Sequence, residues 1–388
     1  MNVPQTIKLI KKNYRDIFYM PRIIGTSNEY QTKLEELLNR YLAFCKNNLT
    51  ELEINYEIAF NISTNINNVL RFYFEGNIKT VYENIYELFE KNIKYLFVEE
   101  FDNLYDNGEN KLFNVYRSRY SDKKLSNIEE MFQIPFDQRY KVDEQRFSIK
   151  GIPCLYLGST PYVCFKEIRQ YKKDNDKFYT SRFQYKKGLN FKILNLATHF
   201  QDIFRVTMDT DNLNSLDAIA YGKISQEEYL KKTIYTFPIQ CACSFLVEEN
   251  ERNFKIEYAV PQIIMNCIKS FQIDGVSYCS TKFDEKNPYS VYLMTNFSIP
   301  AYSKSNELYS EKLSRIFEVT EPLCFEDFLE NKPPKPPFYE FTKFVDLINH
   351  DKNLGVINSQ NYIETDYYQY EKELENKPVH NIPIIKIL

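Results

Sequence analysis

The periodicity of the apolar residues changes partway along the chain, and this change decides which fold class the chain can adopt. From about Ser27 to Phe101 apolar residues recur at steps of three and four, which indicates amphipathic helices. From about Lys111 to Pro300 short apolar segments alternate with turn residues, which indicates strands and fewer helices. We therefore expect an α+β protein, with a helical N-terminal domain followed by a mixed α/β domain.

The N-terminal part is expected to be a small helical bundle. One apolar stripe consists of Leu34, Leu37, Leu38, Tyr41, Leu42 and Cys45. A second stripe consists of Ile78, Val81, Ile85, Leu88, Phe89, Ile93, Leu96 and Phe97. Ser27 or Asn28 is a candidate N-cap for the first helix, and Gly108 with its polar neighbours ends the pattern.

The remainder of the chain divides into a mixed part and a polar part. The expected strands are Ile152–Leu157, Phe191–Leu196 and the segments FYTSRFQY, VSYCS and VYLMTNF. The expected helices are Thr160–Tyr171, Gln226–Val247 and Pro261–Phe271, with Pro261 as a first-turn proline. After about Ala301 the chain is polar, and NKPPKPPF (Asn331–Phe338) resembles a linker. We expect three domains, at residues 1–108, 109–300 and 301–388.

Charge and targeting signals limit the classes of function. The chain carries 49 Lys and Arg against 53 Asp and Glu, a net charge of −4 that gives no general attraction for nucleic-acid phosphates. The N-terminal segment MNVPQTIKLIKKNYRDIF has no apolar core before a small-residue cleavage site. No segment approaches the ~18 apolar residues of a membrane-spanning helix. We expect a cytoplasmic protein that binds neither nucleic acids nor membranes.

Cysteine and histidine show no metal-binding pattern. The closest two of the eight cysteines, Cys241 and Cys243, have one residue between them rather than the two of zinc and redox motifs. The three histidines are His199, His350 and His380. We expect reduced, buried cysteines and no metal site.

Arg146, Tyr156 and Glu167 surround one expected strand and the helix that follows it. An arginine offers a planar fork to phosphate oxygens, and a tyrosine ring can stack on nicotinamide. A carboxylate favours the oxocarbenium-like charge that develops when a glycosidic bond breaks. The three together suit a dinucleotide that carries a pyrophosphate and a cationic ring. The alternative from spacing alone is a surface Arg–Glu pair and a core tyrosine.

Four segments resemble the RES domain, a family named for its Arg, Glu and Ser. They are VYRSRY (Val115–Tyr120), RFSIKGIPCLYLGS (Arg146–Ser159), CFKEIR (Cys164–Arg169) and VPQIIMNCIKSFQIDGVSYCS (Val260–Ser280). All four occur in the family's order, which makes the resemblance specific where any single segment would be weak.

The resemblance implies a fold like that of the ADP-ribosyltransferases, especially the diphtheria-toxin-like branch, with Arg standing in place of His. Many RES proteins are toxins of toxin–antitoxin pairs that deplete NAD by hydrolysis or phosphorolysis, or that transfer ADP-ribose to a protein. It therefore implies NAD as the substrate, no metal, and an antitoxin or regulatory protein as a partner. A homo-oligomer is left open.

The resemblance also implies which arginines bind the substrate. Arg117 matches the first arginine of the family, with Arg119 as the close alternative, and Arg146 matches the second. The matched arginines would anchor the pyrophosphate of NAD.

Three further residues complete the implied site. Tyr156 matches the ring that stacks on nicotinamide. Glu167 matches the catalytic carboxylate, which would orient the ribose and stabilise the developing positive charge at its anomeric carbon. Ser280 matches the late serine, which would bind the nicotinamide end or its ribose. Nicotinamide leaves NAD as a neutral molecule, so no strong general acid is required.

Other features have competing interpretations. Gln262 either caps a helix or belongs to the site. Glu249 and Glu251 form the E-x-E pair of another ADP-ribosyltransferase branch, or a solvated loop. The helical N-terminus resembles HEPN-like extensions of longer RES proteins, but a HEPN ribonuclease needs a histidine soon after an arginine, and the first histidine after this part is His199. We expect a regulatory, dimerising or partner-binding module there.

Three functions follow from these observations. The first is an NAD glycohydrolase or phosphorylase acting as a toxin or defence effector. The second is an ADP-ribosyltransferase that modifies a macromolecule, and the third is a non-catalytic module that binds NAD or a partner. We favour the first two because all the matched positions hold the residue types of the family.

Overall fold

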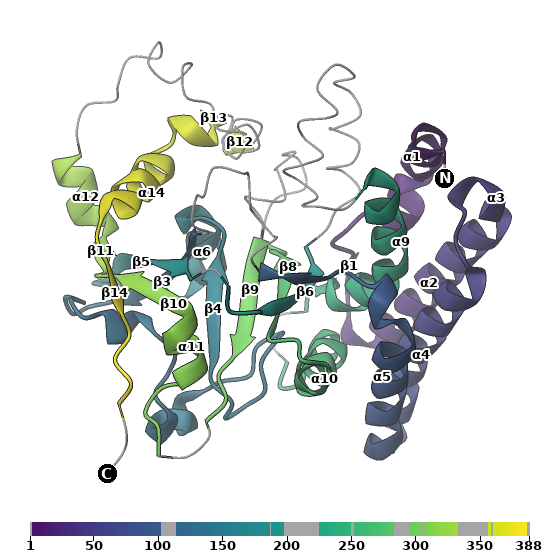
Figure 1. Cartoon of the computed structure of the whole chain (residues 1–388), viewed down its shortest axis with the longest axis horizontal. Helices are drawn as coiled ribbons and strands as arrows, with labels where there is room; N and C mark the ends of the chain where they lie inside the picture. The colour runs from purple at the N-terminus through teal and green to yellow at the C-terminus, as the bar shows by residue number, and fades with distance from the viewer. Residues whose placement is uncertain are drawn as a thin grey trace. The chain divides into compact units, whose positions relative to one another are not determined.

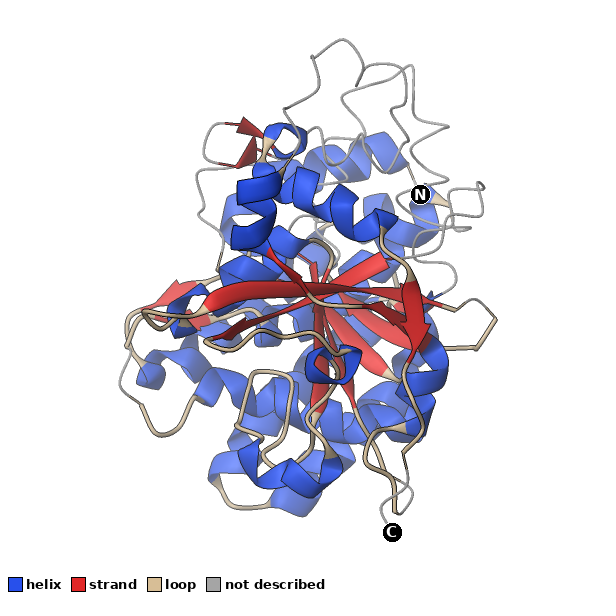
Figure 2. Ribbon diagram, turned by 90° about the vertical axis from the view of Figure 1, so that its left-hand side faces the viewer, coloured by secondary structure: helices blue, strands red, loops and turns tan. Residues whose placement is uncertain are grey.

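The computed structural model describes residues 2–101, 114–186, 188–197, 225–249, 252–282, 295–303, 306–332, 356–357 and 360–385. Helices and strands both contribute to the fold, and a helical N-terminus precedes a mixed set of strands (Figures 1 and 2). This confirms the predicted α+β class. The chain forms two compact units, unit 1 (Met1–Leu104, Asp143–Ile149 and Phe191–Thr281) and unit 2 (Tyr105–Val142, Lys150–Asn190 and Lys282–Leu388).

Unit 1 is mainly helical. Its α-helices are α1 (Val3–Lys12), α2 (Tyr30–Asn47), α3 (Leu49–Leu52), α4 (Tyr56–Phe74), α5 (Ile78–Asn92), α9 (Gln226–Cys243) and α10 (Ala259–Cys267). Its strands are β1 (Ile23–Ile24), β2 (Val98–Glu100), β6 (Lys192–Leu196), β7 (Leu246–Val247) and β8 (Gly275–Cys279). Short helical turns are η1 (Tyr14–Phe18), η2 (Ser27–Glu29), η3 (Ile93–Tyr95), η8 (Ile256–Tyr258) and η9 (Ile268–Phe271).

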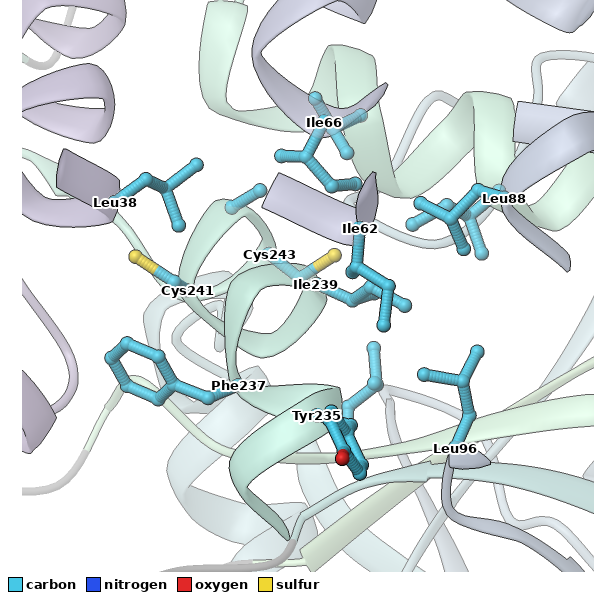
Figure 3. Packing of buried hydrophobic residues seen from close by; sticks show 14 of the residues in the cluster. Leu38, Ile62, Ile66, Leu88, Leu96, Tyr235, Phe237, Ile239, Cys241 and Cys243 are labelled. Carbon is cyan, nitrogen blue, oxygen red and sulfur yellow. The ribbon is translucent and has the colours of Figure 1, made fainter. Parts of the chain in front are cut away.

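Helix α9 lies at the centre of the core of unit 1 and packs against α2 and α4 (Figure 1). Figure 3 shows side chains of α9 beside Leu38 of α2 and Ile62 of α4, all of them buried. Two buried tyrosines of α2 also donate to backbone oxygens of α9: Tyr30 to that of Ala242, and Tyr41 to that of Ile234, each at 2.7 Å. The helical bundle therefore includes α9, which begins more than 100 residues after the end of the expected N-terminal domain.

Three strands of unit 1 pair with one another. Strand β2 is antiparallel to β6, and β6 is parallel to β8. The region around β2 was expected to be helical, and that expectation is wrong for Val98–Glu100. Leu96 and Phe97 are buried and continue the helical spacing, so periodicity alone did not reveal where the helix ends.

Unit 2 is built around an antiparallel sheet with the strand order β14-β10-β5-β3-β4-β9, and β11 also pairs with β5. The strands are β3 (Asn114–Ser121), β4 (Cys154–Gly158), β5 (Lys177–Tyr185), β9 (Thr295–Pro300), β10 (Phe317–Thr320), β11 (Leu323–Cys324), β12 (Val356–Ile357), β13 (Gln360–Asn361) and β14 (Val379–Asn381). The helices are α6 (Pro161–Ile168), α11 (Glu311–Ile316), α12 (Phe325–Asn331) and α14 (Asp366–Asn376), with the turns η5 (Ile128–Met131), η6 (Phe136–Lys141), η7 (Arg169–Tyr171) and η12 (Tyr362–Glu364).

The C-terminal part is not an appendage, which differs from the polar extension expected after Ala301. Strand β10 pairs with β5 inside the sheet, and β14 pairs with β10. Helix α14 packs against α6 and β5. The buried carboxylate of its Glu371 accepts hydrogen bonds from Tyr362 at 2.6 Å and from Tyr116 of β3 at 3.4 Å. The polar composition of residues 301–388 did not indicate these strands, because each strand is short and pairs with a strand that is distant in the sequence.

The two units cut across the three expected consecutive segments. Strand β6 follows residue 109 but belongs to unit 1 because it pairs with β2. Strand β10 follows residue 301 but belongs to unit 2 because it pairs with β5. The segments 1–108, 109–300 and 301–388 therefore do not coincide with the two compact units. Their assignment as functional modules stays a prediction.

Most of the expected local elements are confirmed with shifted bounds. Pro261 is the third residue of α10 rather than the first. A backbone N–H at the third position would also have no intrahelical acceptor, so a proline is tolerated there. The cysteines are free, and all but Cys279 are buried, as expected. Gly108, Glu251 and the prolines of the linker-like segment lie outside the described residues. Within the described ranges, no helix combines the length and the apolar character that crossing a membrane requires.

Candidate functional site

Strands β3 and β4 part from each other within the sheet of unit 2. Strand β3 pairs with β5 along its whole length, and β4 pairs with β9 along its whole length. Between β3 and β4 the ladder has a single pair, Tyr116 opposite Gly158. Beyond that pair the two strands no longer satisfy each other's backbone groups. We call this divergence the strand fork.

Arg117 and Tyr156 meet at the strand fork. Arg117 follows Tyr116, the residue of β3 that pairs with β4, and its Nη1 atom donates to the backbone oxygen of Tyr156 on β4 at 3.4 Å. A side-chain donor thus replaces the missing ladder donor, since buried carbonyls are almost always hydrogen-bonded. The structure therefore brings together two of the residues that the sequence assigned to one site.

Arg117 and Arg119 lie on the same face of β3, because side chains two residues apart in a strand point the same way. Nη2 of Arg119 donates to the backbone oxygen of Phe132 at 3.0 Å. Burial and the neighbouring Arg119 lower the pKa of Arg117 to about 9, and burial also lowers the pKa of Arg119. No carboxylate among the described residues forms an ion pair with either arginine. Two poorly solvated cations are costly, so a bound anion would stabilise this arrangement.

Glu167 lies on α6, whose N-terminus has common capping residues. Thr160 is the N-cap and accepts from the amide of Val163, and Pro161 occupies the first helical position. The half-buried carboxylate of Glu167 accepts a hydrogen bond from Nδ2 of Asn296 at 2.6 Å. This contact holds the carboxylate toward β9, the strand beside β4.

Asn296 is a further candidate site residue that the sequence interpretation missed. It lies opposite Gly158 in the β4–β9 ladder, in a strand whose residues are all buried. A buried amide inside an apolar strand needs a hydrogen-bond partner, and this was the available signal. The sequence could not name Glu167 as that partner, which precedes Asn296 by 129 residues.

Gly158 lets helix α6 approach the sheet closely. A Cβ atom at this position would lie 2.8 Å from Sγ of Cys164 and 3.3 Å from both the amide nitrogen of Cys164 and the backbone oxygen of Thr160. Cys164 in turn donates to the backbone oxygen of Tyr116, the last residue before the strand fork. The absence of a side chain at Gly158 therefore sets the position of the helix that carries Glu167.

Gly158→Ala is expected to destabilise the protein by about 1–3 kcal/mol, because overpacking forces the helix away from the strand. The free energy of unfolding in urea measures this. Adding Cys164→Ala should recover part of the loss by removing the closest atom, while the two backbone contacts remain. A loss that Cys164→Ala does not reduce would contradict the assignment of Sγ as the main obstacle.

A cleft of about 740 Å³ opens beside the second half of β3. Its lining includes Ser118, Arg119 and Tyr120 of the strand, Tyr171 of η7, and the segment from Lys173 to Asp176. Residues from both faces of β3 line this cleft. This is possible because β4 does not pair with β3 beyond Tyr116. Its size lies in the range of small-molecule sites, about 300–1,000 Å³.

Arg146 belongs to unit 1, where it contacts backbone oxygens and an aromatic ring. Its Nη1 and Nη2 atoms donate to the backbone oxygens of Cys243 at 3.0 Å and of Phe245 at 2.9 Å, at the C-terminal end of α9. Its guanidinium lies 5.0 Å from the ring centre of Tyr258. The arginine thereby satisfies carbonyls that the helix end leaves without intrahelical donors. The pyrophosphate contact expected for Arg146 stays a prediction.

Arg146→Ala is expected to lower the free energy of unfolding by about 1–3 kcal/mol, since it leaves two carbonyls at the end of α9 without their donor. Urea unfolding followed by circular dichroism measures the change. Arg71→Ala is the matched control, because this exposed arginine also lies over a ring, 4.7 Å from that of Phe72. Equal stabilities of the two variants would argue against the structural role.

The other residues singled out from the sequence lie in unit 1. Ser280 is buried directly after β8. Gln262 does not cap α10; its Nε2 atom donates to Glu144 and to the backbone oxygen of Gln145, beside Arg146. Glu249 accepts from the backbone amide and the hydroxyl of Ser27, which anchors the segment before α2. This structural role agrees with the loop interpretation of Glu249.

Comparison with known proteins found a relative whose name is that of a putative toxin. The chain is 27% identical over 347 residues to a protein named putative toxin YopC of Bacillus subtilis (strain 168), covering 84% of this chain and 72% of that protein. Among solved structures, the M. tuberculosis MbcT–MbcA toxin–antitoxin complex matches with a TM-score of 0.28 and 8% identity, over 55% of this chain and 84% of the solved chain. A TM-score this low supports no conclusion about the fold. No protein-family model matches the chain.

Proposed function

We propose that this chain is an NAD-consuming enzyme that cleaves the bond between nicotinamide and ribose. The observation that supports it most is the strand fork, where Arg117 contacts Tyr156. Arg117 and Arg119 form no ion pair with any described residue, and they lie in the same unit as Tyr156 and Glu167. The likeness to a protein named as a putative toxin supports a harmful activity such as NAD depletion. The four segments that resemble the RES domain agree with both points.

The proposed reaction needs charge stabilisation rather than acid catalysis. The bond between the anomeric carbon and the nicotinamide nitrogen breaks, and its electron pair neutralises the ring as it leaves. The positive charge that develops on the ribose is stabilised by the carboxylate of Glu167, which Asn296 holds in place. Arg117 and Arg119 bind the pyrophosphate, and the ring of Tyr156 holds nicotinamide.

The acceptor defines the product. Water adds its oxygen to the anomeric carbon and releases a proton, which yields ADP-ribose. Inorganic phosphate would yield ADP-ribose 1-phosphate, and a protein side chain would yield a modified protein. An enzyme that depletes NAD in its own cell also requires restraint, so we include an inhibitory protein partner in the proposal.

Incubating the purified chain with NAD and measuring free nicotinamide by chromatography tests the proposal. We expect nicotinamide to appear in proportion to the amount of protein, with the co-product identifying the acceptor. Reactions without phosphate, with phosphate, and with a cell lysate separate the three acceptors. NAD that persists in all three reactions would contradict the proposed function.

A further inference from the structure

Buried polar atoms without partners gather on the face of the sheet that carries Arg117. Ser181 of β5 lies directly opposite Arg117 in the antiparallel ladder, so their side chains share that face. Ser181 is fully buried. Its hydroxyl oxygen and the Nε atom of Arg117 are both buried and make no hydrogen bond to any described residue.

The segment from Met131 to Gln133 covers the same face. The ring of Phe132 stacks on that of Phe183, two residues after Ser181, with centres 6.3 Å apart and planes 11° apart. The backbone oxygen of Phe132 accepts from Arg119. Gln133 follows at once and is fully buried, and neither atom of its amide has a hydrogen-bond partner within the described ranges.

These groups together need an explanation that packing does not supply. About 90% or more of buried polar groups in proteins are hydrogen-bonded. Here a hydroxyl, a carboxamide and a guanidinium nitrogen have no hydrogen-bond partner within the described part of the chain, and the two arginines have no ion pair there. Burial lowers the pKa of Arg119, and Tyr309 and Glu130 act against this lowering. The Oε2 atom of Glu130 already accepts from the backbone amides of Ser126 and Asn127. The donors in this set, which are the Ser181 hydroxyl, Nε2 of Gln133 and Nε of Arg117, lack an acceptor among the described residues, and the charge of the two arginines favours an acceptor that is negative.

We propose that Ser181 and Gln133 complete an anion site with Arg117 and Arg119, and that its ligand is a phosphate or pyrophosphate group. The two arginines supply positive charge and paired donors. The hydroxyl of Ser181 and the amide nitrogen of Gln133 supply neutral donors. The inference rests in part on the proposed function, because the pyrophosphate of NAD is a ligand of this class.

Calorimetric titration of the full chain with inorganic pyrophosphate, and separately with NAD, tests the inference. Ser181→Ala and Gln133→Met remove the polar atoms while nearly conserving volume. Ser314→Ala is the matched control, because Ser314 of α11 is another buried hydroxyl of unit 2 without a partner among the described residues. Each of the first two variants should weaken pyrophosphate binding at least about fivefold, as expected for one lost charge-assisted hydrogen bond, and the control should not.

Thermal unfolding separates a binding role from a structural one. Removing a buried polar atom that has no partner should leave the Tm unchanged or raise it, in all three variants. If Ser181→Ala or Gln133→Met unfolds, Ser181→Cys and Gln133→Leu are measured in its place. Weaker pyrophosphate binding at an unchanged or higher Tm is the result that a structural role would not produce.

Three outcomes decide the matter. Unchanged pyrophosphate affinity in the Ser181 and Gln133 variants would overturn the inference and favour internal water as the missing partner. A wild-type chain that binds neither pyrophosphate nor NAD would overturn it as well. Pyrophosphate binding that depends on Ser181 and Gln133, in a chain that never releases nicotinamide, would support the anion site and contradict the proposed function.

Discussion

Glu167→Gln is expected to lower kcat for nicotinamide release about 10²–10³-fold while the Kd for NAD changes little. Glutamine has the shape of glutamate, and its Oε1 atom still accepts from Asn296, so the position of the side chain is preserved. What disappears is the negative charge that the proposed mechanism places beside the anomeric carbon, where it would act only as positive charge develops. Turnover and calorimetric titration on the same preparation measure the two quantities.

Glu373→Gln is the matched control for this variant. Glu373 is an exposed glutamate on α14 of the same unit, so its replacement should change neither kcat nor Kd. Equal turnover in Glu167→Gln and wild type would remove Glu167 from the chemistry. A parallel loss of NAD binding would instead make it a binding residue.

Arg117→Met is expected to abolish most NAD binding, with an affinity loss of at least about 30-fold, and to leave the free protein as stable or more stable. Truncating one partner of a buried charge pair costs about 2–5 kcal/mol of binding. In the free protein the guanidinium has no ion pair among the described residues, and burial and Arg119 lower its pKa. Methionine fills similar space without a charge, and this gain should outweigh the loss of the long 3.4 Å contact with the Tyr156 carbonyl, so unfolding should need about 1 kcal/mol more free energy.

Arg315→Met controls for the loss of an arginine in unit 2. Arg315 is largely exposed and pairs with Glu311 on the surface of α11, so its replacement should leave both stability and NAD binding nearly unchanged. Urea unfolding and titration with NAD measure both variants. A large stability loss in Arg117→Met with intact NAD binding would show that Arg117 serves only the Tyr156 carbonyl.

The difference between the two arginine predictions reflects where each side chain finds its partners. Arg146 donates from both terminal nitrogens to the end of α9, so its loss is expected to destabilise the free protein. Among the described residues, Arg117 makes one long hydrogen bond at the strand fork, and its Nε atom has no partner. The resemblance assigned both to the pyrophosphate, and only the three-dimensional contacts separate them.

Local elements could be predicted well from the sequence. The strands β4, β5, β6 and β8 and the helix α6 lie where the apolar patterns and turn residues indicated. These patterns depend on neighbours within a few positions, so the sequence contains the necessary information. The order of the motif residues likewise placed Arg117, Tyr156 and Glu167 in the predictions before any contact was known.

Only the tertiary structure decided how these elements combine and what surrounds the site. Strand β2 pairs with β6 and strand β10 with β5, and neither pairing leaves a local trace in the sequence. Asn296 reaches Glu167 across 129 residues, and Ser181 faces Arg117 across the ladder. Such contacts depend on which distant strands become neighbours. Local patterns show that a residue is polar or buried, but not which partner it meets.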